Sequence, residues 1–162
     1  VKVNMGTPIL LPKDVPVVSD KDKVVDEPIV IDDKEYRITC VSMGNPHAIT
    51  FIENTDDLEI ETIGPKFENN PIFPDRVNTE FIQVLDRNTV KMRVWERGSG
   101  ETFACGTGAC ATVVACVLNG LTDDKVTVKL LGGDLFIEYN REENTVYMTG
   151  PAKVSFTGKI EV

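Results

Sequence analysis

The chain has 162 residues, of which 41% are hydrophobic and 27% are charged, and its formal net charge is −9 at pH 7. This length fits one domain large enough to bury a core, and the acidic balance argues against nucleic acid or an anionic membrane as a partner. The sequence has no apolar run of about 18 residues and no apolar segment behind a basic N-terminus, so neither membrane spanning nor export is indicated, and a cytoplasmic location is expected.

The first quarter of the chain predicts short strands joined by polar segments. Residues 1–11 alternate loosely between apolar and polar side chains before Pro12, which predicts a strand followed by a loop. Residues 13–27 are rich in Asp, Lys and Pro and predict a solvated connection. Two further strand patterns, 29–31 and 36–43, flank a polar turn, as expected for a hairpin.

The middle of the chain predicts one interrupted strand, one surface helix and one hairpin. The Gly-Asn-Pro tripeptide at 44–46 is predicted to break the preceding strand, which resumes over 47–52. Residues 58–69 space their apolar side chains as a surface helix does. Residues 78–85 and 89–95 alternate as two strands with one buried face.

The last third of the chain predicts one helix and several strands. Residues 106–118 are small or apolar on almost every side, which is typical of a helix buried all round. Residues 126–131, 134–139 and 145–148 predict short strands, and 153–162 predict a last strand pair or a tail. The predicted fold is therefore α+β, a strongly curved and largely antiparallel β-roll or barrel wrapped around one central buried helix.

The segment that leads into this helix is the strongest candidate for a functional site. Cys105 stands at or just before the first helical turn, where free N–H groups and the positive end of the helix dipole stabilise an anion. We therefore expect its thiol to ionise more easily than a free cysteine, whose pKa is about 8.5. Gly106 and Gly108 carry no side chains beside the same N–H groups, so a substrate carboxylate can approach the backbone.

The cysteines predict neither a disulfide nor a metal site. On a helix, Cys105 and Cys110 lie about 140° apart around the axis, while Cys105 and Cys116 are separated by about 16 Å along it. Cys110 and Cys116 are expected to be small buried residues. No metal is therefore expected at these cysteines.

Three segments of the chain resemble the diaminopimelate epimerase family. They are ERGSGETFACGTGAC at 96–110, MGNPHAI at 43–49 and RVNTEF at 76–81, in the order expected for that family. The resemblance covers most of this chain but only the C-terminal half of such an enzyme. The other half of the family contributes its own cysteine in a CGNG-type turn, and no second turn of that kind occurs here. The chain also opens at Val1 without a Met, so we expect it to be a domain excised from a longer polypeptide.

The resemblance implies a β-roll fold and a cofactor-independent reaction, the interconversion of LL- and meso-diaminopimelate. One cysteine removes the α-proton and a second reprotonates the opposite face, and Cys105 would be one of the two. The N–H groups of Gly106 and Thr107 would hold the α-carboxylate, and Glu96 would accept from the α-ammonium group. His47 would help to set the protonation states. Three further residues would hold the distal end of the substrate: Asn45, Asn78 and Arg97.

Without the resemblance, most of these side chains also have ordinary explanations. A lone histidine such as His47 is more often a surface or hydrogen-bonded residue, and Glu96 fits a solvated charge equally well. Asn45 and Asn78 are typical of turns and strand ends, and Arg97 of a surface charge. Two other carboxylates are interpreted as structural, Glu80 and Glu101.

The expected organisation is a C-terminal catalytic half-domain over residues 1–150 followed by a terminal strand or tail over 151–162. That tail would pack on the missing N-terminal half or on a neighbouring chain, and a homo-oligomer is possible. The isolated chain is expected to be inactive as an epimerase. Two other classes stay open: acyl transfer or hydrolysis by a Cys105–His47 nucleophile pair, and a non-catalytic binding or assembly domain.

Overall fold

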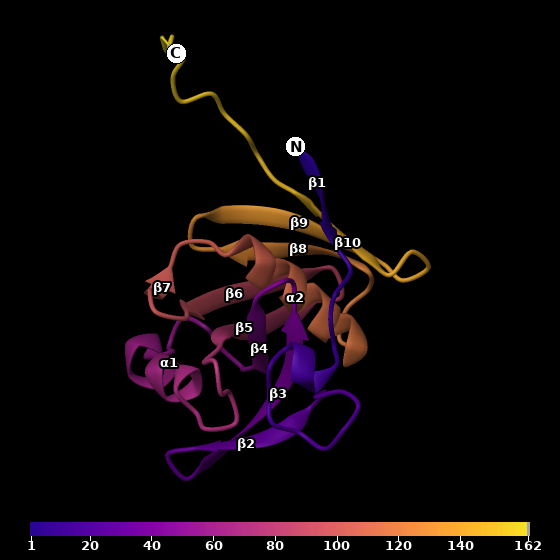
Figure 1. The fold of residues 1–162 in the computed structure, drawn as a ribbon, viewed down its shortest axis with the longest axis vertical. Coiled ribbons are helices and arrows are strands. Elements are labelled where there is room, and N and C mark those ends of the chain that lie inside the picture. Colours follow the sequence, from indigo (N-terminus) through magenta and orange to yellow (C-terminus); the bar gives the residue numbers. More distant parts are fainter. Residues whose placement is uncertain (162) are drawn as a thin grey trace.

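A single curved sheet forms most of the molecule in the computed structural model, which describes residues 1–161. Within these residues the strand order is β1-β10-β9-β8-β6-β5-β4-β3-β2, and β7 pairs with β6 outside this path. The sheet curves around helix α2 (Gly106–Leu118), while helix α1 (Ile60–Glu68) lies on its outer side (Figure 1). The predicted α+β roll with one central helix is therefore confirmed.

The strands follow the predicted segments closely. They are β1 (Lys2–Gly6), β2 (Glu27–Ile31), β3 (Lys34–Ser42), β4 (Pro46–Phe51), β5 (Asn78–Asp86), β6 (Thr89–Glu96), β7 (Gly100–Thr102), β8 (Lys125–Leu130), β9 (Gly133–Asn140) and β10 (Thr145–Thr149), with a short 3-10 helix at Pro12–Asp14. Strand β7 was not predicted, because the sequence there was interpreted as part of a glycine-rich turn. Strands β4 and β5, and likewise β6 and β8, pair in parallel, and the other pairs are antiparallel.

The Gly-Asn-Pro tripeptide reverses the chain instead of interrupting one strand. Ser42 pairs with Pro46 in an antiparallel register, so β3 and β4 form a hairpin. Gly44 has a φ of +97°, a backbone conformation that favours glycine. The prediction of one interrupted strand was therefore wrong, because the tripeptide supplies a tight turn with a left-handed position.

Helix α2 is buried because its side chains are small and apolar on every side. All residues from Gly108 to Cys116 are buried. Val113 and Val114 pack with strand residues such as Val128 in one core cluster. Burying each large aliphatic side chain contributes roughly 1.5–3 kcal/mol, so the sheet that encloses α2 is also its main source of stability.

A second core cluster lies on the other face of the sheet, under helix α1. Phe67 of α1 packs on Phe81 of β5 with ring centroids 5.4 Å apart. Val15 and Val24 are buried in the same cluster. The segment 13–27 is therefore not simply a solvated connection, because its valines cover this second core while its charges face the solvent.

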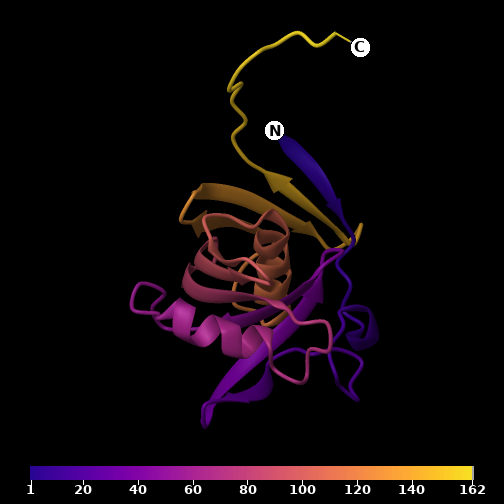
Figure 2. The same ribbon diagram turned by 60° about the vertical axis from the view of Figure 1, so that its left-hand side comes forward.

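The first and last strands, β1 and β10, pair at one edge of the sheet. The Val1 ammonium group donates to the carbonyl oxygen of Gly150 at 2.8 Å. Beyond it, residues 151–161 form no strand and project away from the sheet (Figure 2). The predicted last strand pair does not form in these residues, and Val162 lies outside the described residues. No helix within residues 1–161 has the length and apolar character needed to cross a membrane.

Candidate active site

Cys105 caps the N-terminus of α2 with its side chain. The residue has extended backbone angles, and its Sγ accepts the N–H of Gly108 at 3.3 Å. The Thr107 hydroxyl lies 3.5 Å from the same sulfur. The Ala109 N–H donates to the Cys105 carbonyl oxygen at 2.9 Å and so begins the helical hydrogen bonds. The N–H groups of Gly106 and Thr107 precede these bonds and point out of the helix end, where an anion can bind.

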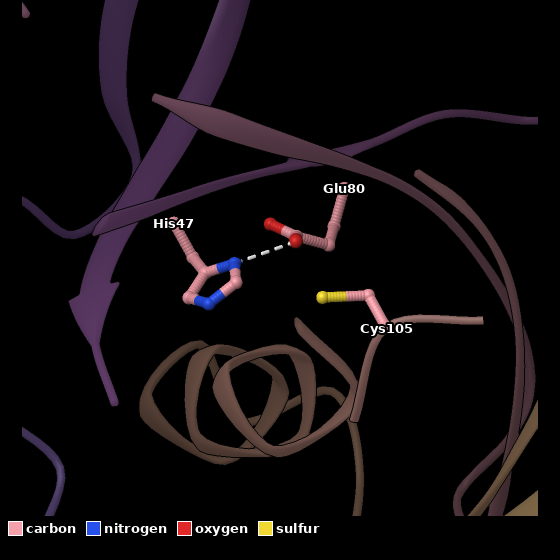
Figure 3. A group of neighbouring side chains, drawn as sticks. All are labelled: His47, Glu80 and Cys105. Atoms are coloured by element: carbon pink, nitrogen blue, oxygen red, sulfur yellow. Dashed lines mark hydrogen bonds and ion pairs between the residues drawn. The ribbon is translucent and has the colours of Figure 1, made fainter. Parts of the chain in front are cut away.

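His47 and Glu80 face Cys105 from two neighbouring strands. Strands β4 and β5 pair in parallel with Ile49 opposite Glu80, so residues on alternate positions of both strands point towards α2. The His47 Nδ1 donates to Glu80 Oε1 at 2.6 Å, and both side chains are 0% exposed. Figure 3 shows the imidazole, the carboxylate and the Cys105 sulfur converging at the start of α2.

The second nitrogen of the imidazole faces another oxygen atom. His47 Nε2 lies 3.0 Å from Asn45 Oδ1 in the turn before β4. Both ring nitrogens of His47 therefore have a polar partner, one on β5 and one in the turn before β4. The structure thus brings Asn45, His47 and Glu80 together.

The glycines of the first helical turn make room for protein side chains. A Cβ at Gly108 would lie 2.5 Å from Glu80 Oε1 and 3.1 Å from Cys105 Sγ. A Cβ at Gly106 would lie 3.2 Å from the sulfur of Met148. Both glycines are predicted to open the backbone to substrate, and Gly108 is in addition needed for the packing of the Glu80 carboxylate against α2.

The thiol of Cys105 is harder to ionise than predicted. Burial, and then the negative charge of Glu80, raise its pKa to about 11, although the Thr107 hydroxyl and the Gly108 N–H act in the opposite direction. The prediction of an easily ionised thiol was therefore wrong for this chain, because the helix end lies under the sheet. Burial raises the pKa of Cys110 and of Cys116 further, to about 12.

The turn after β6 holds the next group of predicted residues. Glu96 Oε1 accepts the Thr102 hydroxyl at 2.5 Å. The Arg97 backbone N–H donates to Asn78 Oδ1, and its guanidinium donates to the Asp75 carbonyl oxygen, each at 2.8 Å. Asn78 also donates to the carbonyl oxygen of Pro46 at 2.9 Å, so its amide connects β4 to this turn. These contacts place Asn78 and Arg97 side by side, and their binding of substrate stays a prediction.

Glu68 of α1 supports the same turn and was not predicted. Its Oε1 accepts from Arg76 Nη1 at 2.8 Å and from the Gly98 N–H at 2.9 Å. Its Oε2 accepts from Trp95 Nε1 at 2.7 Å, and the residue is 5% exposed. An acidic residue near the end of a surface helix carries no signal of burial in the sequence. For Glu80 a signal existed, because it lies two residues after Asn78 and so shares its face of the strand.

His47, Glu80 and Cys105 are also the residue types that bind metal ions. Each offers one atom, and the three atoms lie within 4.8 Å of one another. A shared ion would have to replace the short hydrogen bond between His47 and Glu80. We therefore interpret the cluster as an acid–base group and not as a metal centre.

Comparisons with known proteins assign the family. The diaminopimelate epimerase family profile matches residues 39–155, which include Asn45, Asn78 and Cys105. The chain belongs to the diaminopimelate epimerase family. Diaminopimelate epimerases from Acetivibrio thermocellus and Agathobacter rectalis are 60% and 57% identical to it, and both alignments cover the whole chain.

The chain spans about 58% of the length of these curated relatives. Among solved structures, a hydroxyproline epimerase from Agrobacterium vitis aligns with a TM-score of 0.61 and 13% identity, covering 91% of this chain and 48% of that one. At that identity the likeness concerns the fold. The diaminopimelate epimerase family and the epimerase fold thus agree with each other, and the relatives contain a further part that this chain lacks.

Proposed function

We propose that this chain is the second-cysteine half of a diaminopimelate epimerase and that Cys105 transfers the α-proton. The observation that carries the proposal is Cys105 at the N-terminus of α2, beside the buried His47–Glu80 pair, in a chain of this family. Residues 1–150 form the half-domain. The missing half supplies the opposite cysteine and closes the site.

The proton transfers take place on opposite faces of one carbon atom. A thiolate on one face takes the α-proton and breaks the C–H bond, and the electron pair is delocalised into the α-carboxylate. On the other face the S–H bond of Cys105 breaks as the new C–H bond forms, so the configuration is inverted and the proton count balances. In the reverse direction Cys105 acts as the thiolate. Its raised pKa keeps it protonated near pH 7, as the donor must be.

The helix end stabilises the charge that develops on the substrate. The N–H groups of Gly106 and Thr107 lie ahead of the first helical bonds and would hold the α-carboxylate, whose charge grows as the carbanion forms. Glu96 would accept from the α-ammonium group. Asn45, Asn78 and Arg97 would bind the distal end of diaminopimelate, a task that suits the planar guanidinium.

Acyl transfer by a Cys105–His47 pair is disfavoured by the hydrogen bonds of the imidazole. Its two nitrogens contact Glu80 and Asn45, and the Cys105 sulfur contacts Thr107 and Gly108 instead. A nucleophile needs its base within hydrogen-bond reach. Proton transfer to carbon has no such requirement, because the thiol itself carries the proton.

The C-terminal tail fits a role at the junction with the missing half. Val154, Phe156 and Ile160 are each more than 80% exposed and stand at even-numbered positions, as on one face of a strand. We propose that residues 151–162 pack on the missing half or on a neighbouring chain. Deleting the tail from the full-length protein should then weaken the association of the two halves, measured as a lower melting temperature.

The deciding experiment follows exchange at the α-carbon. The full-length protein that contains this chain is incubated with LL-diaminopimelate in deuterium oxide, and the α-proton signal is followed by NMR. We expect deuterium incorporation together with the meso isomer, and neither for the 162-residue chain alone. Epimerisation by this chain alone would show that a second base exists within it and would overturn the two-half mechanism.

A further inference from the structure

Glu80 is a carboxylate buried in the middle of the candidate site, and the proposed proton transfer does not use it directly. It is 0% exposed, and its Oε2 atom has no hydrogen-bond partner among the described residues. A buried ion pair adds little to stability, since desolvation offsets the attraction between the charges. An apolar residue at this position of β5 would serve the core as well, so the carboxylate calls for a functional explanation.

The contacts of Glu80 reach both reactive side chains of the site. Its Oε1 is hydrogen-bonded to His47 Nδ1 at 2.6 Å. The same oxygen atom would lie only 2.5 Å from a Cβ atom at position 108. Glu80 therefore packs directly against the helical turn that carries Cys105. Only glycine at position 108 leaves room for it.

Four ionisable groups surround the Cys105 sulfur. Glu80 lies on β5, His47 on β4, Glu96 at the end of β6, and Cys110 on α2 itself. Among these groups Glu80 makes the largest electrostatic contribution to the raised pKa of Cys105, and Glu96 a smaller one. After burial itself, Glu80 is thus the strongest influence on the protonation of the thiol.

We propose that Glu80 is the positioning residue of this site: it fixes the imidazole of His47 and holds a buried carboxyl group beside the Cys105 sulfur. A thiol held beside a carboxylate releases its proton to water less readily, and the thiolate that forms in the reverse direction is a stronger base towards carbon. The use of this proton rests on the proposed function. The protonation of Cys105 itself does not, and it can be measured separately.

The first test measures the reactivity of Cys105 in the 162-residue chain. The chain and its Glu80→Gln variant are alkylated with iodoacetamide from pH 7 to pH 11, and Cys105 labelling is quantified by peptide mapping. Gln keeps the shape and removes the charge, so we expect the pH profile of Cys105 to move to lower pH and labelling at pH 8 to rise several-fold. An unchanged profile, or one moved to higher pH, would overturn the proposal.

The matched control is Glu101→Gln. Glu101 is paired with Arg93 at 2.7 Å on the other side of β6 and does not contribute to the pKa of Cys105, so this variant should label Cys105 as the native chain does. Cys116 reports on folding, because it is fully buried. If Cys116 labels as fast as Cys105 in Glu80→Gln, that variant has unfolded and Glu80→Asp decides instead.

The Glu80→Asp variant separates the effect of the negative charge from the effect of the hydrogen bond to His47. It keeps the negative charge but withdraws it by one methylene, which breaks the bond to His47. We expect a Cys105 labelling profile close to native together with a fall in kcat of about tenfold or more in the full-length protein. A native kcat in this variant would overturn the positioning role.

The second test uses turnover by the full-length protein. Glu80→Gln should lower kcat by about 100-fold, the lower end of the range for acid–base groups, and change KM much less, because Glu80 is not among the groups assigned to the substrate. Native turnover would overturn the proposal. If instead the unmodified full-length protein shows no epimerisation, the proposed function fails, while the labelling result still decides the role of Glu80.

Discussion

Each of the two helices lies in the connection between a pair of parallel strands, but α2 is buried whereas α1 is partly exposed. Helix α1 connects the parallel pair β4 and β5, and α2 connects the parallel pair β6 and β8. Both crossovers step in the same direction across the sheet, but the strands of one pair point opposite to those of the other, because β5 and β6 are antiparallel. Crossovers of the same hand then place the helices on opposite faces, and α2 is enclosed by the curved sheet while α1 keeps one side in solvent.

This difference separates two tasks at the site. Helix α2 brings the reacting sulfur and two open N–H groups, all on a buried helix without a charged side chain. Helix α1 touches no reacting group, but its Glu68 holds the turn that carries Glu96 and Arg97. We infer that one helix supplies the chemistry and the other holds the substrate-binding turn in place. The following predictions test that division, in order of expected effect.

The largest effect is expected for Cys105→Ala in the full-length protein. Removing the proton donor should lower kcat by at least about 10²-fold, and the fold should persist because alanine fits this turn of small residues and removes only the cap bond from the Gly108 N–H, a loss of about 0.5–2 kcal/mol. Cys105→Ser should be impaired as well, since a hydroxyl is a much weaker acid than a thiol. Turnover close to native, with unchanged circular dichroism, would remove Cys105 from the mechanism.

A pair of glycine substitutions compares the two helices directly. In α2, a Cβ at Gly108 meets Glu80 at 2.5 Å, and in α1 a Cβ at Gly64 meets the Trp95 ring at 2.4 Å. Overpacking should lower the free energy of unfolding by about 1–3 kcal/mol in each case, measured by urea denaturation. Only Gly108→Ala should also disturb the acid–base group and reduce kcat strongly.

The control for this pair is Gly158→Ala. Nothing lies within 4 Å of a Cβ at that position in the exposed tail of the 162-residue chain, so the free energy of unfolding of that chain should not change. Equal losses of kcat in the Gly64 and Gly108 variants would contradict the division between the helices.

Glu68→Gln should weaken the support that α1 gives to the turn. The carboxylate accepts three hydrogen bonds, from Arg76, Gly98 and Trp95. A Gln amide has only one acceptor oxygen, and its NH₂ group would face at least one of these N–H donors without forming a hydrogen bond. We expect a loss of about 1–3 kcal/mol in stability and a higher KM with a smaller change in kcat. Trp95 is the only tryptophan, so its fluorescence reports the rearrangement, and an unchanged KM would separate α1 from substrate binding.

The smallest effect concerns the alkaline stability of the 162-residue chain. Burial raises the pKa of Cys105 to about 11 from an ordinary value of 9.0, so above about pH 9 the unfolded chain loses this proton before the folded chain does. The unfolded state then binds fewer protons, and the free energy of unfolding falls as the pH rises. The contribution reaches at most about 1.4 kcal/mol per pH unit for one cysteine.

Comparing the native chain with Cys105→Ala isolates this contribution. Urea midpoints at pH 8, 9.5 and 10.5 should fall less steeply in the variant, although Cys110 and Cys116 still titrate in the same direction. Parallel curves for the two proteins would mean that the thiol of Cys105 has the same pKa in the folded and unfolded chain.

The sequence predicted the elements whose signals are local. Residues 106–118 were predicted as a buried helix and form α2 with the same bounds, because the whole segment is small and apolar. The predicted polar turn after β2 also forms, but it contains only Asp32 and Asp33, both with positive φ. Such features depend on neighbours within a few residues, so the sequence suffices for them.

The features that the sequence missed depend on contacts between distant segments. The burial of Glu68 follows from the packing of α1 on the sheet, which no residue pattern near this position reveals. For Glu80 the alternation along β5 indicates the face it shares with Asn78, but not that α2 covers it. The raised pKa of Cys105 has the same origin, because helix position alone predicts a lowered value and only the enclosing sheet reverses it. His47 and Asn45 were found through the resemblance, since one histidine in a turn is otherwise an ordinary residue.

The parallel pairing of β4 with β5 also determines when the site forms during folding. The bond between His47 and Glu80 joins residues 33 positions apart in the chain, and a parallel pair can close only after its crossover has been laid against the sheet. Residues this far apart in sequence lose the entropy of loop closure before they gain any contact energy, so such contacts form slowly. We therefore expect the acid–base group to form together with the central sheet, and Cys105 to react with alkylating reagents during refolding until the sheet is complete.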